Sequence, residues 1–334
     1  MNIEEKFKEF YNRFLISNKD SFNKMENQRN KAIYERKNNK KIIIIVELIL
    51  LIVFILWIIV FGLDENNDTI PELCFLAGFL FPMIIALKKK QKLEEYEDIY
   101  QNTIIRNIIQ YFSPRLDYYP DESIGCEDYQ KIGVENFNEF NSSNTIRGIY
   151  TNNEITISKI ITKYIRSYNH YNGLFKEGPT IRKRTSVEET FNGIFVKAKL
   201  SKSANTELYI KSKEEINESI FNSFIENISN AEGKEYDKID IQELNDIFNV
   251  YSSNLEGYSR ILDSEIKTTL INIYNNQKFE LVIKNNYIYI RFWIDGLFSN
   301  PPLERETNDK EILYKNYKVL YLVFYLLTKI EEKI

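Results

Sequence analysis

The sequence predicts an α+β protein in which a two-helix transmembrane hairpin precedes a cytoplasmic domain with a mainly antiparallel sheet and packed helices. Three observations lead to this prediction. Two long apolar runs lie near the N-terminus, basic residues flank both runs, and short strand-like runs alternate with helical periodicities in the rest of the chain. The mean hydropathy is −0.37, which excludes a polytopic transporter.

The composition limits the chemistry. Ile, Asn, Lys, Tyr and Phe are abundant, while the 334 residues include 11 Gly and 7 Pro, a bias typical of AT-rich bacterial coding. Two cysteines, one of them inside an apolar run, exclude a disulfide framework and a thiolate metal site. A single histidine excludes most zinc sites and most Ser–His or Cys–His mechanisms. We therefore expect no cofactor and no metal.

Ile42–Leu63 is the longer apolar run and carries one charge, Glu47. As a helix it is about 33 Å long, enough to cross a hydrocarbon core of about 30 Å. A signal peptide is the competing interpretation, but the run is too long and begins too far into the chain. Ile70–Leu87 is shorter, and Pro82 is expected to kink it. A buried soluble helix stays open for this second run, although the neighbouring run favours a hairpin.

Basic residues set the orientation of the hairpin. Six Lys or Arg residues lie in 29–41 and four in Lys88–Lys92, whereas the segment between the spans has only acidic charges. The positive-inside rule therefore places both flanks in the cytoplasm. We expect a bacterial inner-membrane protein with both termini in the cytoplasm. The predicted segments are a cytoplasmic amphipathic helix (1–41), transmembrane helix one (42–63), a short external loop (64–69), transmembrane helix two (70–87), a cytoplasmic stalk helix (88–113) and a cytoplasmic α+β domain (114–334).

Both flanks of the hairpin show helical periodicity. Apolar side chains recur at helical spacing in 3–36 and in 93–112, and Ser113-Pro114 is expected to end the second helix. The two helices either pack together as a short stalk or lie on the lipid surface, and packing is the favoured interpretation.

Glu47 is the ionisable residue inside the first predicted span. It lies about 9 Å from Lys41 by helical rise. Intramembrane carboxylates are candidates for function. At this depth, however, a neutral carboxyl or pairing with a snorkelling lysine such as Lys88 is the favoured interpretation.

Residues 93–334 carry the acidic excess of a chain whose formal net charge is −4, whereas the segments beside the spans are basic. An acidic domain argues against nucleic-acid binding, which requires phosphate neutralisation. The local exception is the run Arg182, Lys183 and Arg184. A loop or a solvated strand edge is the favoured interpretation, and contact with a phosphate or a lipid headgroup is the alternative.

Short alternating runs indicate strands in the domain. "FELVIKNNYIYIRFW" is the clearest hairpin, because the Asn pair at 285–286 tolerates the positive φ of a tight turn. Helical spacing predicts a helix over 262–274, with Asp263 or Ser264 as its N-cap. The apolar stretch 314–330 could be mistaken for a third span, but two lysines shorten it, so we predict a buried terminal helix.

The stretch "DIFNVYSSNLEGYSRILDSEIKTTLINIYNNQKFELVIKNNYIYIRFWIDGLFSNP" resembles the C-terminal region of an uncharacterised bacterial membrane-protein family, the domain of unknown function numbered 3137 (DUF3137). The earlier "FNGIFVKAKLSKSANTELYI" resembles the F-x-G-x-F strand of the same family. The matching positions are Phe191, Gly193, Phe195, Phe248, Val250, Tyr251, Tyr258, Ile261, Leu262 and Phe298.

This resemblance implies two leading spans and a cytoplasmic domain, and it implies no activity and no catalytic residues. Leu255-Glu256-Gly257 departs from the acidic-Ala-Arg cluster that members usually carry. Genes of the family are said to neighbour those of LemA-type membrane proteins, which implies a protein partner of that kind.

Few residues point to catalysis. The sequence contains none of the phosphate-loop, zinc-protease or nucleophile-elbow motifs. His170 has no acid or nucleophile beside it, and the acids next to Cys126 are expected to raise the pKa of its thiol. In "FWIDGLFSNPP", Trp293 and Phe298 are more typical of a core, but they would form a protein-binding patch if they were exposed.

Three functions remain open. We favour a non-enzymatic protein-interaction module, either a scaffold or a regulator. The alternative is a membrane-tethered sensor that binds a small anionic ligand or a phospholipid headgroup through Arg182, Lys183 and Arg184. The third is a hydrolase or transferase of unrecognised type. The expected partners are the lipid bilayer and another membrane or cytoplasmic protein, without nucleic acid.

Overall fold

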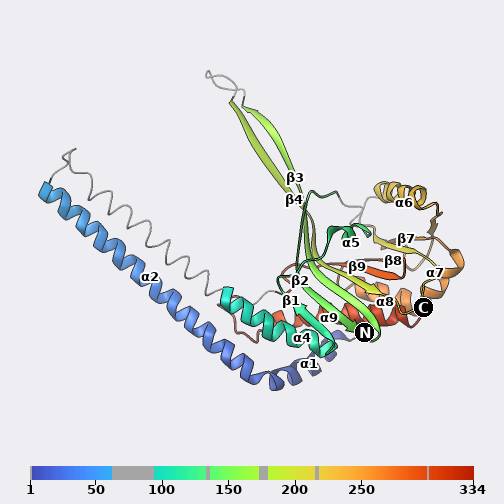
Figure 1. Cartoon of the computed structure of the whole chain (residues 1–334), viewed down its shortest axis with the longest axis horizontal. Coiled ribbons are helices and arrows are strands. Elements are labelled where there is room, and N and C mark those ends of the chain that lie inside the picture. Colours follow the sequence, from blue (N-terminus) through green and yellow to red (C-terminus); the bar gives the residue numbers. More distant parts are fainter. Residues whose placement is uncertain (1, 62–93, 133–135, 173–179, 215–217, 299–300) are drawn as a thin grey trace. The chain divides into compact units, whose positions relative to one another are not determined.

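The computed structural model describes residues 2–61, 94–132, 136–172, 180–214, 218–298 and 301–334. The chain forms two compact units, which are described separately (Figure 1). Unit 1 comprises Met1–Phe7, Ile105–Phe298 and Tyr314–Ile334, and unit 2 comprises Lys8–Ile104 and Ser299–Leu313.

Unit 1 is built on one sheet, in which the described residues form nine strands in the order β1-β2-β3-β4-β9-β8-β5-β7-β6. Every neighbouring pair is antiparallel, so the predicted α+β class with an antiparallel sheet is confirmed. The strands are β1 (Leu116–Tyr119), β2 (Glu139–Tyr150), β3 (Asn153–Asn172), β4 (Thr180–Lys199), β5 (Leu208–Ser212), β6 (Asp237–Ile239), β7 (Phe248–Ser252), β8 (Phe279–Lys284) and β9 (Tyr287–Trp293).

Helices precede, connect and follow these strands. The predicted turn between β8 and β9 is confirmed, since Asn285 and Asn286 have φ values of +50° and +64°. The predicted cap of α8 is also confirmed, because the Asp263 side chain accepts a hydrogen bond from the backbone of Ile266 at 2.9 Å. The helices are α4 (Arg106–Phe112), α5 (Cys126–Gln130), α6 (Glu218–Glu232), α7 (Leu255–Ile261), α8 (Ser264–Tyr274) and α9 (Lys310–Glu331), and a π-helical turn, η1, covers Gln101–Ile105.

One face of the sheet packs against α5 and α6. Tyr129 of α5 and Phe221 of α6 are buried together with Phe195, Tyr209 and Tyr289, which come from three different strands of the sheet. Alternation along each strand sends every second side chain to this face. We call it the α5/α6 face.

The opposite face packs against α8 and α9. Phe248 of β7 lies 5.1 Å from Tyr274 of α8, and Tyr150 of β2 lies 4.3 Å from Phe324 of α9, both between ring centroids. The apolar residues of α9 are buried in this layer, so the predicted buried terminal helix is confirmed. Both faces of the central strands are therefore covered, as in a sheet flanked by helices.

Unit 2 contains most of α1 (Ile3–Ser17) and all of α2 (Lys19–Phe61). The predicted boundary between residues 41 and 42 falls inside α2, because the amphipathic and apolar parts form one continuous helix. A second helical segment over 94–100 faces α2 across a cavity of about 150 Å³ lined by Gln28 and Tyr96. The predicted flanking helices therefore lie side by side, and the second ends before Ser113 as predicted.

Among the residues that the structure describes, no helix has the length and apolarity needed to cross a bilayer. Described side chains of the first predicted span end at Leu56, and Glu47 is exposed on α2. The external loop at 64–69, the second predicted span at 70–87 and the basic run Lys88–Lys92 lie outside the described residues.

Candidate interaction site

Strands β3 and β4 continue beyond the sheet as a two-stranded ribbon. β2 pairs with β3 only as far as Lys163, and β9 pairs with β4 only from Gly193 onward. Beyond these points, within the described residues, Tyr164–Asn172 pairs with Thr180–Glu188 and with no other strand (Figure 1). We call this paired segment the β3–β4 ribbon.

The base of the ribbon is solvated on both faces. A register shift between Thr162 and Lys163 separates the ribbon from the sheet, and such a bulge bends a strand away from its neighbours. Arg166 and Ser167 are exposed on β3, and Val187 of β4 is 59% exposed despite its apolar side chain. An exposed apolar β-branched side chain lacks the burial that normally makes such a residue favourable in a strand.

The two edges of the ribbon differ. On the β3 edge, the backbone N–H of Ile165 donates to Asn138 Oδ1 at 2.8 Å, and Asn138 Nδ2 donates to the carbonyl of Ile165 at 2.8 Å. The Asn138 amide therefore occupies the position of a neighbouring strand. We call this pair of bonds the Asn138 clamp.

The β4 edge has no such cover among the described residues. Directly opposite residues of an antiparallel pair either bond to each other or both turn away. The backbone groups of Ile165 point to Asn138, so those of its partner Val187 point outward from β4. The same alternation directs the backbone of Thr185 outward. An unpaired edge of this kind is a template for another strand.

The outer edges of the sheet contrast with the ribbon. β1 has four residues, which alternate between buried and exposed, and β6 has three, of which the first two are exposed. Short edge strands are a common protection against unwanted pairing. Within the described part of the chain, the outer edge strands are therefore short, whereas the β4 edge of the ribbon is uncovered.

The predicted basic run lies on this ribbon. Arg182 is paired in register with His170, Lys183 with Asn169, and Arg184 with Tyr168. The backbone of this run therefore forms a strand, as in the strand-edge interpretation, and not a loop. His170 also lies in a strand, on β3.

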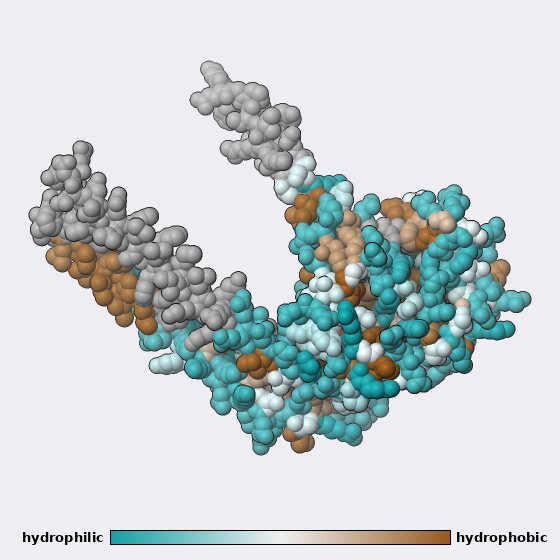
Figure 2. All heavy atoms as spheres, viewed as in Figure 1, coloured by the Kyte–Doolittle hydropathy of each residue, from teal (hydrophilic) through white to brown (hydrophobic). Residues whose placement is uncertain are grey.

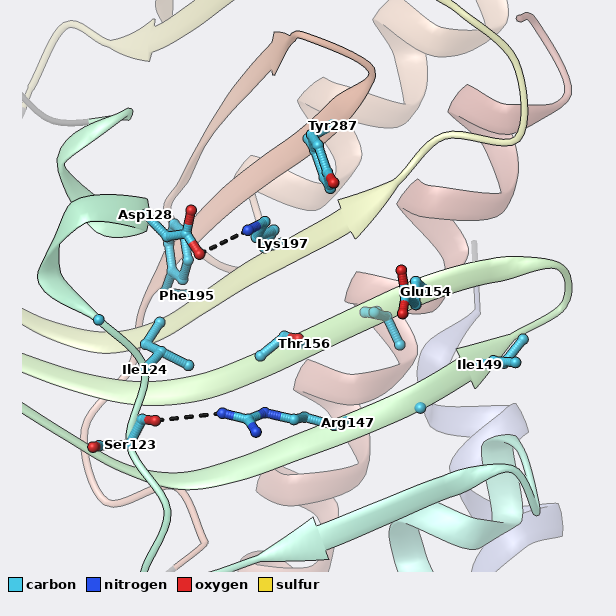
Figure 3. A pocket seen from close by; sticks show the side chains of 13 residues that line it. Ser123, Ile124, Asp128, Arg147, Ile149, Glu154, Thr156, Phe195, Lys197 and Tyr287 are labelled. Atoms are coloured by element: carbon cyan, nitrogen blue, oxygen red, sulfur yellow. Dashed lines mark hydrogen bonds and ion pairs between the residues drawn. The ribbon is translucent and has the colours of Figure 1, made fainter.

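A polar trough of about 560 Å³ lies on the α5/α6 face, away from the ribbon (Figure 3). Its floor includes Arg147, Thr156 and Lys197 from three adjacent strands, and the segment before α5 forms a wall. Lys197 Nζ lies 2.7 Å from a carboxylate oxygen of Asp128, and Arg147 lies 2.9 Å from Glu122. The cationic side chains of the trough, Lys197 and Arg147, are therefore already paired with carboxylates of the same chain.

The electrostatics of the trough are those of structural ion pairs. Partial burial acts to raise the pKa of Asp128, but hydrogen bonds from Lys131 and Lys197 outweigh it and hold that pKa below its usual range. Burial, with Glu127 as a second cause, raises the pKa of the nearby Cys126 thiol, in the direction predicted. A thiol with a raised pKa is a poor nucleophile at neutral pH.

A buried ionic row crosses the same face and was missed by sequence reasoning. Lys211 Nζ lies 2.7 Å from a Glu280 carboxylate oxygen, and Arg291 pairs with the same oxygen. All three side chains are completely buried. Arg291 Nη1 also donates to Tyr129 Oη at 3.0 Å. The sequence carries one signal for this row: a charged residue recurs at inward positions of strands whose other residues are apolar.

Trp293 and Phe298 belong to packed surroundings. The ring of Trp293 lies 5.2 Å from that of Phe191 and 5.2 Å from the Arg291 guanidinium. Phe298 is 1% exposed, and its backbone N–H donates to Asn316 Oδ1 at 2.9 Å. The favoured core interpretation agrees with both positions, and Phe298 cannot contact a partner while the fold is intact.

Comparison with known proteins agrees with the resemblance noted in the sequence. No curated protein and no solved structure matches the chain. The region that matches a protein-family model begins in β4 and ends in α9. It therefore includes every hallmark position from Phe191 to Phe298, and the β3–β4 ribbon precedes it. Residues 189–331 match the family described as "Protein of unknown function (DUF3137)".

Proposed function

We propose that this protein is a non-enzymatic interaction module that binds another protein by strand addition to the β3–β4 ribbon. The observation that carries the proposal is the β4 edge at Thr185–Val187, which no described residue covers, beside a β3 edge that the Asn138 clamp occupies at Ile165. Strand addition supplies main-chain hydrogen bonds from an edge, and neighbouring side chains supply specificity.

The stability of the ribbon supports the same proposal. A two-stranded ribbon is marginally stable in water, and three or more strands are needed for independent stability. The ribbon base exposes Val187 and also Thr185, Ser186 and Glu188. A partner strand on the β4 edge would provide the third strand.

We further propose that a hairpin of 42–63 and 70–87 tethers the module to the bacterial inner membrane, with both termini in the cytoplasm. Support comes from α2, on which large apolar side chains are 36–56% exposed and appear as the brown stretch in Figure 2. Exposed apolar surface of this extent is typical of contact with lipid or protein. These side chains are Ile42, Ile44, Ile45, Leu48, Ile49, Leu51, Ile52, Val53, Ile55 and Leu56.

The test is a capture experiment with the full chain in mild detergent and two variants at one position. Val187→Pro removes an outward N–H from the β4 edge without removing a bond between β3 and β4, because that N–H faces away from β3. Val187→Thr keeps the N–H and the β-branched shape. We expect proteins captured stoichiometrically by the wild type to be retained by Val187→Thr and lost with Val187→Pro. Equal capture by all three chains would refute binding through this edge.

A further inference from the structure

We propose that the partner on the β4 edge is a second copy of this chain, so that two ribbons pair through antiparallel β4 edges around a two-fold axis at Ser186. This inference rests on the proposed function, since it names the partner of the same edge. A two-fold contact uses the same surface on both copies, so the surface must be complementary to itself.

The charge order along β4 meets that condition. Arg182, Lys183 and Arg184 precede the central Thr-Ser-Val, and Glu188 and Glu189 follow it. Antiparallel pairing of two such strands brings the basic half of one copy opposite the acidic half of the other. Opposite charges across a strand pair are stabilising and like charges are destabilising. A parallel alignment would place like charges together, so the sequence favours the antiparallel one.

The direction of the backbone groups fixes the register. Residues that point outward must meet residues that point outward, which on β4 are the odd-numbered positions that include Thr185 and Val187. Centring on Ser186 pairs Thr185 with Val187 of the second copy. It also brings the position of Arg184 opposite Glu188 and that of Lys183 opposite Glu189.

The neighbouring allowed register is less favourable. Centring on Thr185 places Arg182 opposite Glu188 but leaves Glu189 opposite Ile181. The Ser186-centred register therefore makes two opposite-charge pairs in each half instead of one.

The rest of the ribbon is consistent with this pairing. The Asn138 clamp occupies the β3 edge at Ile165, whereas no described residue occupies the β4 edge opposite it at Val187. Two paired ribbons form a four-stranded sheet with the order β3-β4-β4-β3, which exceeds the minimum that gives a sheet independent stability. The exposed Val187 side chain gains a cross-strand neighbour in the second copy.

Cysteine crosslinking tests the register in the full chain, with Cys74 and Cys126 replaced by serine. Ser186 would face its own copy as a non-hydrogen-bonded pair, with Cα atoms about 4.5 Å apart, within the range of about 4.4–6.8 Å that a disulfide spans. We expect Ser186→Cys to form a disulfide-linked dimer under mild oxidation. Ser167→Cys is the matched control, because β3 lies outside the pairing and its copies would be at least about 14 Å apart.

Charge reversal gives a second, independent readout. The variant Glu188→Lys/Glu189→Lys and the variant Arg182→Glu/Lys183→Glu/Arg184→Glu are each expected to weaken self-association more than tenfold. Mixing the two variants restores opposite charges across the pair, so we expect a heterodimer with close to wild-type affinity. Because the two chains must fold to restore binding, the mixture also controls for misfolding.

The outcomes separate this inference from the proposed function. Preferential crosslinking of Ser186→Cys with rescue by the mixed charge variants supports a two-fold pair. Crosslinking no greater than that of Ser167→Cys, or no rescue, overturns it. If the chain stays monomeric while Val187→Pro still loses a captured protein, the second copy is excluded but strand addition by another protein stands.

Discussion

At the scale of single residues, the buried row of Lys211, Glu280 and Arg291 is the most consequential feature of the core. One carboxylate oxygen serves two cations, all fully buried, and Glu280 holds them together. Removing one partner of a buried ion pair leaves an uncompensated charge, which costs more than the pair itself contributes. The row therefore makes the fold sensitive to a change that alters no volume.

We predict that Glu280→Gln lowers the free energy of unfolding by about 3–5 kcal/mol, because two buried cations lose their common carboxylate. Urea unfolding of the full chain at neutral pH measures this. Glu243→Gln is the matched control, since Glu243 is an exposed carboxylate that pairs with Lys267. Little change is expected for the control, and an equally small effect at Glu280 would show that the row does not stabilise the fold.

The same carboxylate predicts a pH dependence. Burial acts to raise the pKa of Glu280, but Arg291 and Lys211 outweigh it and hold that pKa below its ordinary value. Its contribution is therefore fully present above the unfolded-state pKa of about 4.3 and is lost as the pH falls through the lower folded-state pKa. The difference in unfolding free energy between wild type and Glu280→Gln should shrink as the pH falls below about 4.3. A difference that stays constant down to the acid limit would contradict this assignment.

β4 and β9 approach each other closely at Gly193, and a substitution at this position tests that contact. A Cβ at this position would lie 1.9 Å from the carbonyl oxygen of Phe292 and 2.9 Å from the Phe191 ring. We predict that Gly193→Ala costs about 1–3 kcal/mol of stability, because backbone must move to admit the methyl group. Gly125→Ala, where nothing lies within 4 Å, is the control and should cost less in the same thermal or urea unfolding series.

At the scale of elements, features that depend on adjacent residues could be predicted from the sequence, but which strands lie side by side could not. The turn at Asn285 and Asn286 and the cap at Asp263 were predictable, because each depends on a few adjacent residues. The ribbon was not predicted, since alternation identifies a strand without showing whether other strands lie beside it. The Asn138 clamp likewise joins residues 27 apart in the chain. α2 continues through residue 42, where the composition changes from polar to apolar, so the change in composition marks no end of the helix.

The Asn138 clamp gives a prediction at this scale. Asn138→Ala removes two hydrogen bonds to the backbone of Ile165 and should reduce stability by about 1–2 kcal/mol. Hydrogen exchange should increase at the base of the ribbon and not in the central strands. Asn141→Ala is the control, because its amide bonds a neighbouring side chain on the same strand. Uniform exchange changes across the sheet would contradict a local clamp.

At the scale of the whole molecule, the proposed interaction module carries its candidate site on an extension of its sheet. The family-like region, residues 189–331, contains β5 to β9, the second half of β4 and the helices α6 to α9, while the ribbon precedes that region. The favoured hypothesis of an interaction module could be formed from the sequence, but its proposed location could not, because it depends on an edge that only the pairing of strands reveals.

Self-association through the ribbon should also respond to salt. The proposed pairs between the basic and acidic halves of β4 are exposed, so ionic screening weakens them. We predict that the dimer dissociation constant rises with salt concentration in sedimentation measurements on the full chain. An affinity that increases with salt would indicate an apolar contact instead.

The most direct test of the central claim is site-specific photocrosslinking in living cells. A photoreactive amino acid replaces Val187 at the open β4 edge or, as a control, Ile220, which is similarly exposed at 54% on α6. We predict a discrete protein adduct from position 187, with the mass of two chains if the partner is a second copy, and none from position 220. Absence of an adduct at 187, or equal adducts from both positions, would contradict binding at the β4 edge.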